Sequence, residues 1–438
     1  MRAIGVLAGL GAVMAVLPAL AADDPPPPPC GTAEAAAAWW NGDGALGDLC
    51  GLRPWLLDRG VTLGGSVQID ALANPTGGSR SDAAISQLGD LSLALDGGKL
   101  LGAQALAHTS LHAEFWWAAG NDLSARSIAS YFDVQQTYTP AGVYIGQLYL
   151  QQDLLDDTLT LRLGRLTTNE TFATIGALQV FVNAAQTNSP AIMMDNFVPF
   201  LESPAATWAA QASFAPKGLP ADFDGSGIQA GVFQYNLRES ELRGTSPWGN
   251  LDWQDDGYMG IAQVTVARQQ ADGADQWPGT FVLGALYSGG NYPDLRTGEN
   301  RDGNFGFYAL GQQVVYRHPG ASGSEGLTPW FAVAWAPLSG RNAVYLQTSL
   351  GAVWPGIVPG RDGDIGAVAV STGWFSEAVD DADAETVVEV AYTIQLNQWL
   401  SLTPDMQYVI NPGGYSDNGG AGNGNDALIV GGQLGITF

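Results

Sequence analysis

The feature that most constrains the fold is a repeated segment of about ten residues in which apolar and polar side chains alternate. Clusters of Gly, Asn, Asp and Pro separate these segments. In residues 385–396 the even positions are mostly apolar, whereas the odd positions include Glu385, Glu389 and Gln395. Because successive side chains of a β-strand point to opposite faces, such a segment has one apolar and one polar face.

A coarse count finds about sixteen such segments. They start near Thr62, Ser86, Gln104, Gly142, Thr158, Pro204, Gly225, Gly257, Gly279, Gly306, Thr328, Val344, Ile365, Glu385, Trp399 and Ala427. A tilted strand of about 9 to 11 residues spans the hydrocarbon layer of a membrane, whereas a soluble sandwich with this many strands would be unusually wide. We therefore predict an all-β fold: a transmembrane antiparallel β-barrel of about 16 strands over residues 61–438, with a short N-terminal helical segment.

Two further patterns favour a membrane barrel. Short connections at residues 156–157 and 397–398 alternate with long ones at 289–304 and 411–426, as expected for periplasmic turns and outer loops. Aromatic residues gather near the predicted strand ends, where girdles at the two membrane interfaces would lie. These are Phe115, Trp116, Trp117, Tyr149, Trp208, Tyr258, Trp330, Trp335, Trp374, Trp399, Tyr408 and Phe438.

The N-terminus indicates export. Arg2, the apolar residues 4–17 and the sequence Ala19-Leu20-Ala21 predict a signal peptide over residues 1–21. No later stretch contains 18 consecutive apolar residues, which excludes a helical membrane protein and leaves a secreted protein or an outer-membrane barrel. Residues 22–60 are expected to form a periplasmic segment that includes the stiff spacer Pro25–Pro29.

The chain has two cysteines, Cys30 and Cys50. An oxidising export route favours a disulfide between them, since two thiols without further ligands do not make a metal site. The closed loop contains the Ala-rich residues 32–40, which we predict to form a short helix. We expect the disulfide to tie this helix down.

The charge balance excludes nucleic acid as a partner. The sequence has 17 Lys and Arg against 43 Asp and Glu, a net charge of -26, and such a chain repels phosphate backbones. Hydrophobic residues make up 46% of the chain, which is too much apolar material for a disordered protein.

We predict neither an enzyme nor a bound cofactor or metal. His108, His112 and Glu114 share one face of a strand and could suggest a metal site, but alternation explains them as polar residues lining a lumen. Many carboxylates fall in predicted loops, where they form a solvated surface rather than a glycosidase pair. The sequence has no nucleophile elbow, P-loop or C-x-x-C motif.

Several segments resemble the carbohydrate-selective porins of the OprB family. Residues 405–414, with the sequence DMQYVINPGG, resemble the C-terminal signature of that family. Residues 359–366 resemble its Pro-Gly-Arg-x-x-Asp segment, and residues 161–166 resemble a strand ending in Gly-Arg. Near the N-terminus, residues 55–61 resemble the start of its first strand and residues 74–78 its first loop.

This resemblance implies a porin in the outer membrane of a Gram-negative bacterium, through which small sugars diffuse passively, with glucose-like monosaccharides favoured. Small sugars and outer-membrane lipid would be its partners. A secreted all-β carbohydrate-binding protein or hydrolase, or a general porin, remain alternatives. Sixteen-stranded porins are often homotrimers, so the resemblance makes a homotrimer a possible assembly.

A sugar-selective lumen needs planar donors and acceptors on its walls. The predicted pore-lining and sugar-contacting residues are Arg162, Arg165, Arg361, Asp364, Glu385, Glu389, Gln395, Asp405 and Gln407. Arg162 and Arg165 have opposite parity, so a regular strand turns only one of them into the lumen: alternation favours Arg162, and a bend at Gly164 favours Arg165. Arg361→Ala is expected to change sugar flux more than Arg80→Ala.

Overall fold

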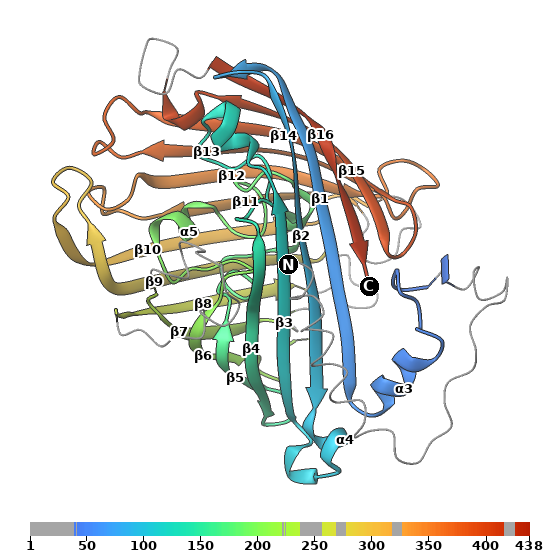
Figure 1. Cartoon of the computed structure of the whole chain (residues 1–438). Helices are drawn as coiled ribbons and strands as arrows, with labels where there is room; N and C mark the ends of the chain where they lie inside the picture. Colours follow the sequence, from blue (N-terminus) through green and yellow to red (C-terminus); the bar gives the residue numbers. More distant parts are fainter. Residues whose placement is uncertain are drawn as a thin grey trace.

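The computed structural model describes residues 39–40, 42–220, 223, 225–236, 256–268, 277–317, 326–415 and 425–438. Within these residues, sixteen strands form one closed barrel, in which each strand pairs with its neighbours in the sequence and β1 pairs with β16 (Figure 1). All the pairings are antiparallel. The predicted fold class and strand number are therefore confirmed.

The strands are β1 (Val61–Gly78), β2 (Asp82–Asp96), β3 (Thr109–Gly120), β4 (Gly142–Leu154), β5 (Leu159–Leu166), β6 (Thr207–Phe214), β7 (Gly227–Gln234), β8 (Tyr258–Arg268), β9 (Gly279–Pro293), β10 (Asn300–Gln313), β11 (Thr328–Trp335), β12 (Val344–Pro355), β13 (Ile365–Phe375), β14 (Ala384–Gln395), β15 (Leu400–Ile410) and β16 (Asn425–Thr437). The helices are α3 (Leu52–Asp58), α4 (Gly97–Leu101) and α5 (Ile192–Asn196), with the short helical turns η1 (Gln104–Leu106), η2 (Ser124–Ile128), η3 (Gly176–Val180) and η6 (Pro412–Gly414). None of the helices in the described part of the chain is long and apolar enough to cross a membrane.

The alternation of the strands has the predicted consequence. Outward-facing side chains such as Leu163, Leu283 and Leu350 are 60–66% exposed, whereas inward-facing Glu385 and Glu389 are fully buried. An exposed apolar outer surface on a closed barrel is the surface that faces lipid. The polar face of each strand therefore lines the lumen.

Two expectations about strand ends were wrong. Residues 289–304 do not form a long outer loop, because β9 continues to Pro293 and β10 already begins at Asn300. Gly289, Gly290 and Asn291, whose residue types are common in loops, are here part of a long hairpin. Among the predicted interfacial aromatics, Tyr149, Trp330 and Trp399 are buried.

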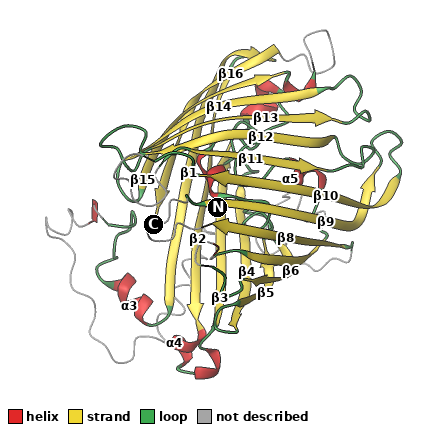
Figure 2. Ribbon diagram, turned by 180° about the vertical axis from the view of Figure 1, so that it is seen from behind, coloured by secondary structure: helices red, strands yellow, loops and turns green. Residues whose placement is uncertain are grey.

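Exposed aromatics nevertheless lie near both ends of the strands. Tyr258, Tyr287, Phe307, Trp335 and Tyr408 lie near one end, and Phe214, Trp277, Phe281 and Tyr316 near the other. The second end also carries the C-terminus, α3 and the short β14–β15 turn, and Figure 2 shows the same arrangement from behind. Short turns are typical of the periplasmic end of such barrels, and we refer to it by that name.

Most of the predicted N-terminal features lie outside the described residues: the signal peptide 1–21, the spacer Pro25–Pro29, Cys30 and most of the 32–40 helix. Trp39 and Trp40 at the end of that helix are helical, and Cys50 is disulfide-bonded. The described part of the segment includes α3, which leads directly into β1.

Candidate pore and its constriction

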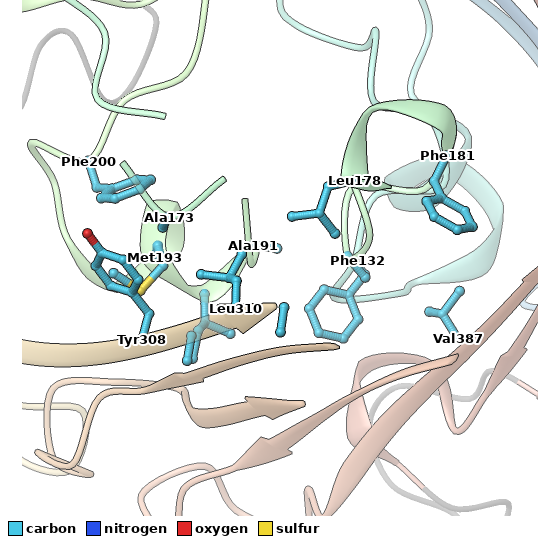
Figure 3. Packing of buried hydrophobic residues seen from close by; sticks show 14 of the residues in the cluster. Phe132, Ala173, Leu178, Phe181, Ala191, Met193, Phe200, Tyr308, Leu310 and Val387 are labelled. Carbon is cyan, nitrogen blue, oxygen red and sulfur yellow. The ribbon is translucent and has the colours of Figure 1, made fainter. Parts of the chain in front are cut away.

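Two long connections from the outer end of the barrel fold back into the lumen. The first inward connection, residues 121–141, joins β3 to β4, and the second, residues 167–206, joins β5 to β6. Their apolar side chains form a buried cluster with the barrel wall, whose members include Phe132, Leu178 and Phe200 from the connections and Tyr308 and Val387 from the wall (Figure 3). The lumen is therefore partly filled by packed protein.

Two carboxylates of β14 hold both connections by accepting hydrogen bonds from backbone N–H groups of the connections. Glu389 accepts hydrogen bonds from the N–H groups of Val182 (2.6 Å) and Asn183 (3.2 Å). Glu385 accepts three hydrogen bonds, from the N–H groups of Tyr131 (2.6 Å), Phe132 (2.9 Å) and Gly413 (2.6 Å). Buried backbone N–H groups need acceptors, and these two carboxylates together accept from five N–H groups.

Amide side chains on other strands hold the connections in the same way. Gln347 of β12 accepts from the Ile192 N–H (3.2 Å) and donates to the Ala185 carbonyl (2.7 Å). Gln407 of β15 donates to the Val134 carbonyl (3.0 Å) and accepts from the Asn183 side chain (2.8 Å). Further contacts come from Asp70, Gln263, Asn304 and Gln312. Both connections are thus fixed to several sides of the barrel.

A cavity of about 340 Å³ lies between the two connections and β2. The polar groups on its wall include the carboxyl groups of Asp133, Asp195 and Glu202, and the side chains of Gln136 and Tyr138. Burial, together with nearby carboxylates, raises the pKa of Asp133 to about 7. Burial also raises the pKa of Glu202 to about 7, although Asn188 donates a hydrogen bond to it. The wall of this cavity is therefore rich in carboxyl groups and other hydrogen-bond acceptors.

A polar patch continues along the lumen wall on β3, β4 and β5. Gln147 bridges two carboxylates, because its amide donates to Glu114 (3.2 Å) and to Glu170 (2.7 Å) of the second inward connection. Ser203 also donates to Glu170 (3.1 Å). The carboxylates of this patch can therefore accept hydrogen bonds on the lumen side of the wall.

Arg162 of β5 lies in the same patch, nearer the periplasmic end. Its guanidinium carbon lies 5.4 Å from the ring centre of Tyr149, and its Nε donates to Gln151 (2.9 Å). The ring of His112 stacks on that of Tyr149 at 4.7 Å. These contacts fix the guanidinium against the wall, where it combines a cation with planar donors.

Comparisons with known proteins agree with this architecture. The sequence profile described as "Carbohydrate-selective porin, OprB family" matches residues 80–438. The chain belongs to this family. Porin B of Pseudomonas aeruginosa is 24% identical over 442 residues, which cover 90% of this chain and 91% of that protein.

Solved structures show the same fold. The high-pH structure of Pseudomonas putida OprB superposes with a TM-score of 0.78 at 21% identity, over 91% of this chain and 99% of that one. The low-pH structure of the same protein gives a TM-score of 0.57 at 17% identity, with the same coverage. The chain is thus an outer-membrane β-barrel protein of Gram-negative bacteria, and family and fold indicate a sugar-selective channel rather than an enzyme.

The porin does not place all the predicted lining residues in its open lumen. Glu385, Glu389 and Gln407 point inward as predicted but are fully buried under the two connections, and Asp405 is 5% exposed beside Gln407. Their inward direction follows from alternation. A strand pattern does not reveal the connections that cover these residues. We expected contact with sugar, whereas Glu385 and Glu389 accept hydrogen bonds from the backbone of the connections.

Arg361, Asp364 and Gln395 lie together at the periplasmic rim, at and beside the β12–β13 turn. Arg361 forms a bidentate pair with Asp364 (2.7 and 2.9 Å) and donates to the Gln395 carbonyl (3.2 Å). The hydrogen bond from Arg361 lowers the pKa of Asp364. These residues form a rim cluster distant in sequence from the two connections.

The ambiguity between Arg162 and Arg165 is resolved by the backbone. Gly164 takes a φ of 148°, a value that side-chain-bearing residues rarely adopt, while its pairing with β4 and β6 continues without a shift. Arg162 lines the lumen, and Arg165 is fully buried at the outer end of β5. Simple alternation therefore accounts for Arg162, but it does not account for the burial of Arg165.

Sequence reasoning placed Glu114 on the lumen wall but missed Gln147, Glu170 and Glu202 as groups of the pore. The available signal was the gap between β5 and β6, since residues 167–206 show no alternation and are too long for a turn. His108 is exposed and lies 3.7 Å from Asp157 at the β4–β5 turn. Within the described ranges, no group of three or more His, Cys, Asp or Glu residues is arranged to hold a metal ion.

Proposed function

We propose that this porin allows small, glucose-like monosaccharides to diffuse passively into the periplasm. The observation that supports this proposal is the acidic cavity between the two inward connections, whose backbone N–H groups donate four hydrogen bonds to Glu385 and Glu389 of the barrel wall. A rigid constriction rich in acceptors suits a small, neutral solute with many hydroxyl groups. It also excludes larger solutes by size.

Sugar contacts are proposed at two levels. At the constriction, Glu202, Gln136 and Tyr138 offer planar acceptors and donors. Towards the periplasm, Arg162 and Glu114 offer a cation and a carboxylate on the same wall. Contacts divided among several such groups are weak enough individually to release the solute, which passive conduction requires.

The other predicted lining residues receive different proposed roles. Glu385, Glu389, Asp405 and Gln407 set the shape of the constriction because they lie beneath the inward connections. The cluster of Arg361, Asp364 and Gln395 shapes the periplasmic mouth. Arg165 is buried and supports the outer end of β5.

Single-channel conductance of the purified protein in a planar bilayer tests the proposal. Glucose, a disaccharide and a neutral non-sugar of the size of glucose are added in turn. Current block by glucose and not by the non-sugar supports sugar selectivity, and weaker block by the disaccharide supports selection by size. Equal effects of all three solutes would instead identify a general porin. A homotrimer also remains a proposal, which native mass spectrometry tests on the same preparation.

A further inference from the structure

An apolar hollow lies outside the barrel at its periplasmic end, between the wall and the N-terminal segment. Its volume is about 160 Å³. The N-terminal segment contributes Leu46, Leu49 and Arg53, and the wall contributes Leu63, Gly64, Leu91, Ser92, Leu93, Phe115 and Phe438. Figure 1 shows α3 of this segment outside the barrel, beside the end of β1.

The register shows that this hollow opens on the lipid side. Leu63 pairs with Leu93, and Leu91 pairs with Phe115, so these side chains share one face of the sheet. The neighbouring residues Ser66 and Asp90, of opposite parity, belong to the lumen face. The hollow is therefore continuous with the surface that the barrel presents to acyl chains.

Specific contacts hold the N-terminal segment in place. Arg53 Nη2 donates to the carbonyls of Phe438 (2.9 Å) and Leu63 (3.1 Å), and the Ala45 N–H donates to the Thr437 carbonyl (2.7 Å). A side chain at Gly44 would place its Cβ 2.5 Å from the Phe438 carbonyl carbon. The segment thus approaches the last strand closely, and fixed groups border the apolar space beside it.

The segment itself carries the side chains of a membrane interface. Trp39 and Trp40 are 42% and 45% exposed and pack against Trp399 of the β14–β15 turn, with ring centres 5.0 and 5.6 Å away. Leu46 is 51% exposed at the hollow. Tryptophan is enriched where headgroups meet acyl chains, so this rim lies at the level of the periplasmic headgroups.

Three basic side chains lie at the same rim, interspersed with the acidic residues Asp48, Asp58 and Asp96. Arg53 lines the hollow, Arg59 lies over the ring of Trp55 at 4.1 Å, and the Lys99 side chain adjoins Gly60 at the start of β1. Cations at an interface attract anionic headgroups.

We propose that the hollow binds part of one acyl chain of a phospholipid from the periplasmic leaflet, whose phosphate lies beside Arg53 and Arg59. Its lining is almost entirely apolar, and an apolar cavity of comparable size accepts an apolar guest. The N-terminal segment then acts as a clamp that holds a lipid against β1 and β2. This inference rests on the membrane location of the barrel and is independent of its solute.

Native mass spectrometry of the full mature protein with palmitoyl-oleoyl phosphatidylglycerol tests the proposal. The wild type is expected to retain one lipid after detergent removal. Leu93→Trp fills the hollow and should weaken retention by about tenfold or more. Leu283→Trp makes the same change at a 66% exposed position on β9 and should retain lipid like the wild type.

Leu49→Trp fills the hollow from the N-terminal segment and leaves the sequence of every strand unchanged. It replaces Leu93→Trp as the test variant if Leu93→Trp does not fold. Folding of each variant is checked by its heat-modifiable migration on a gel. Undiminished retention by a folded filled variant would overturn the proposal. The proposal would also be overturned if the wild type carried no lipid and Leu49→Trp changed its oligomeric state. That result would show that a second copy of the chain covers the hollow.

The headgroup is tested separately. Arg59→Gln should weaken retention of phosphatidylglycerol and leave retention of dodecyl maltoside unchanged, because only the phospholipid carries a phosphate. Equal effects on both ligands would overturn the proposed phosphate contact.

Discussion

Glu389 on the barrel wall accepts a 2.6 Å hydrogen bond from the backbone N–H of Val182, which lies 207 residues earlier in the chain. The same carboxylate accepts a second hydrogen bond from the N–H of Asn183. The connection that narrows the pore is therefore held by a side chain of the opposite half of the sequence. Loss of this contact should be visible as a change in conductance.

Glu389→Ala is expected to increase the single-channel conductance and to reduce discrimination between glucose and a non-sugar of equal size. The substitution leaves two buried N–H groups without their acceptor, at about 1–3 kcal/mol each, and the second inward connection then loses its position. Val390→Ala is the matched control, because this neighbour faces lipid at 45% exposure. Unchanged conductance in a folded Glu389→Ala variant would contradict the anchoring role.

Arg162→Gln is expected to weaken glucose block of the channel by about tenfold, since a charge-assisted hydrogen bond contributes roughly 1.5–3 kcal/mol. The measurement is the concentration of glucose that halves the current. Arg361→Gln is the comparison, because Arg361 is paired with Asp364 at the periplasmic rim. A larger effect of Arg361→Gln would transfer the proposed sugar contact to the rim.

The cation selectivity of the pore should increase as the pH rises through about 7. Asp133 and Glu202 both have pKa values near 7, so they are mostly neutral below this pH and negative above it. The reversal potential in a KCl gradient measures the change. Because both pKa values are raised above their ordinary values, the same ionisation also destabilises the folded protein as the pH rises.

The double variant Asp133→Asn and Glu202→Gln should remove most of this pH dependence. The substitutions keep the size of both side chains, so the constriction keeps its shape. A pH response as large as that of the wild type would mean that other groups control selectivity.

Arg53→Ala should lower the free energy of unfolding in detergent by about 1.5–3 kcal/mol, because Arg53 ties α3 to the carbonyls of Leu63 and Phe438. Urea titration followed by tryptophan fluorescence gives this quantity. Arg80→Ala is the control: its pair with Asp82 is a surface contact at 60% side-chain exposure, and a much smaller change is expected. Equal losses in the two variants would argue against a special role of Arg53.

Much of the barrel could be predicted because its signal is local. In β14 the alternation from Glu385 to Gln395 assigns each side chain to lipid or lumen, and the structure keeps this assignment. Turn residues also mark most strand ends. The prediction near Gly306 was the least accurate, because the long β9–β10 hairpin contains residue types that are common in loops.

The candidate site was less predictable. Alternation turned Glu389 correctly toward the lumen but could not reveal that residues 167–206 would cover it. Arg162 was assigned to the lumen by parity, whereas Arg165 follows Gly164, whose backbone has an unusual φ of 148°. Such local backbone conformations and covering contacts have no periodic signature.

The sequence by itself determined the number of strands, their antiparallel order and the face on which each side chain lies, because a period of two is set by the backbone of each strand alone. Only the tertiary structure decided which lumen-facing groups remain free to meet a solute and which are used to hold the inward connections. That distinction depends on hydrogen bonds between residues far apart in the chain, such as Val182 and Glu389, which form only when the barrel has closed around its own connections.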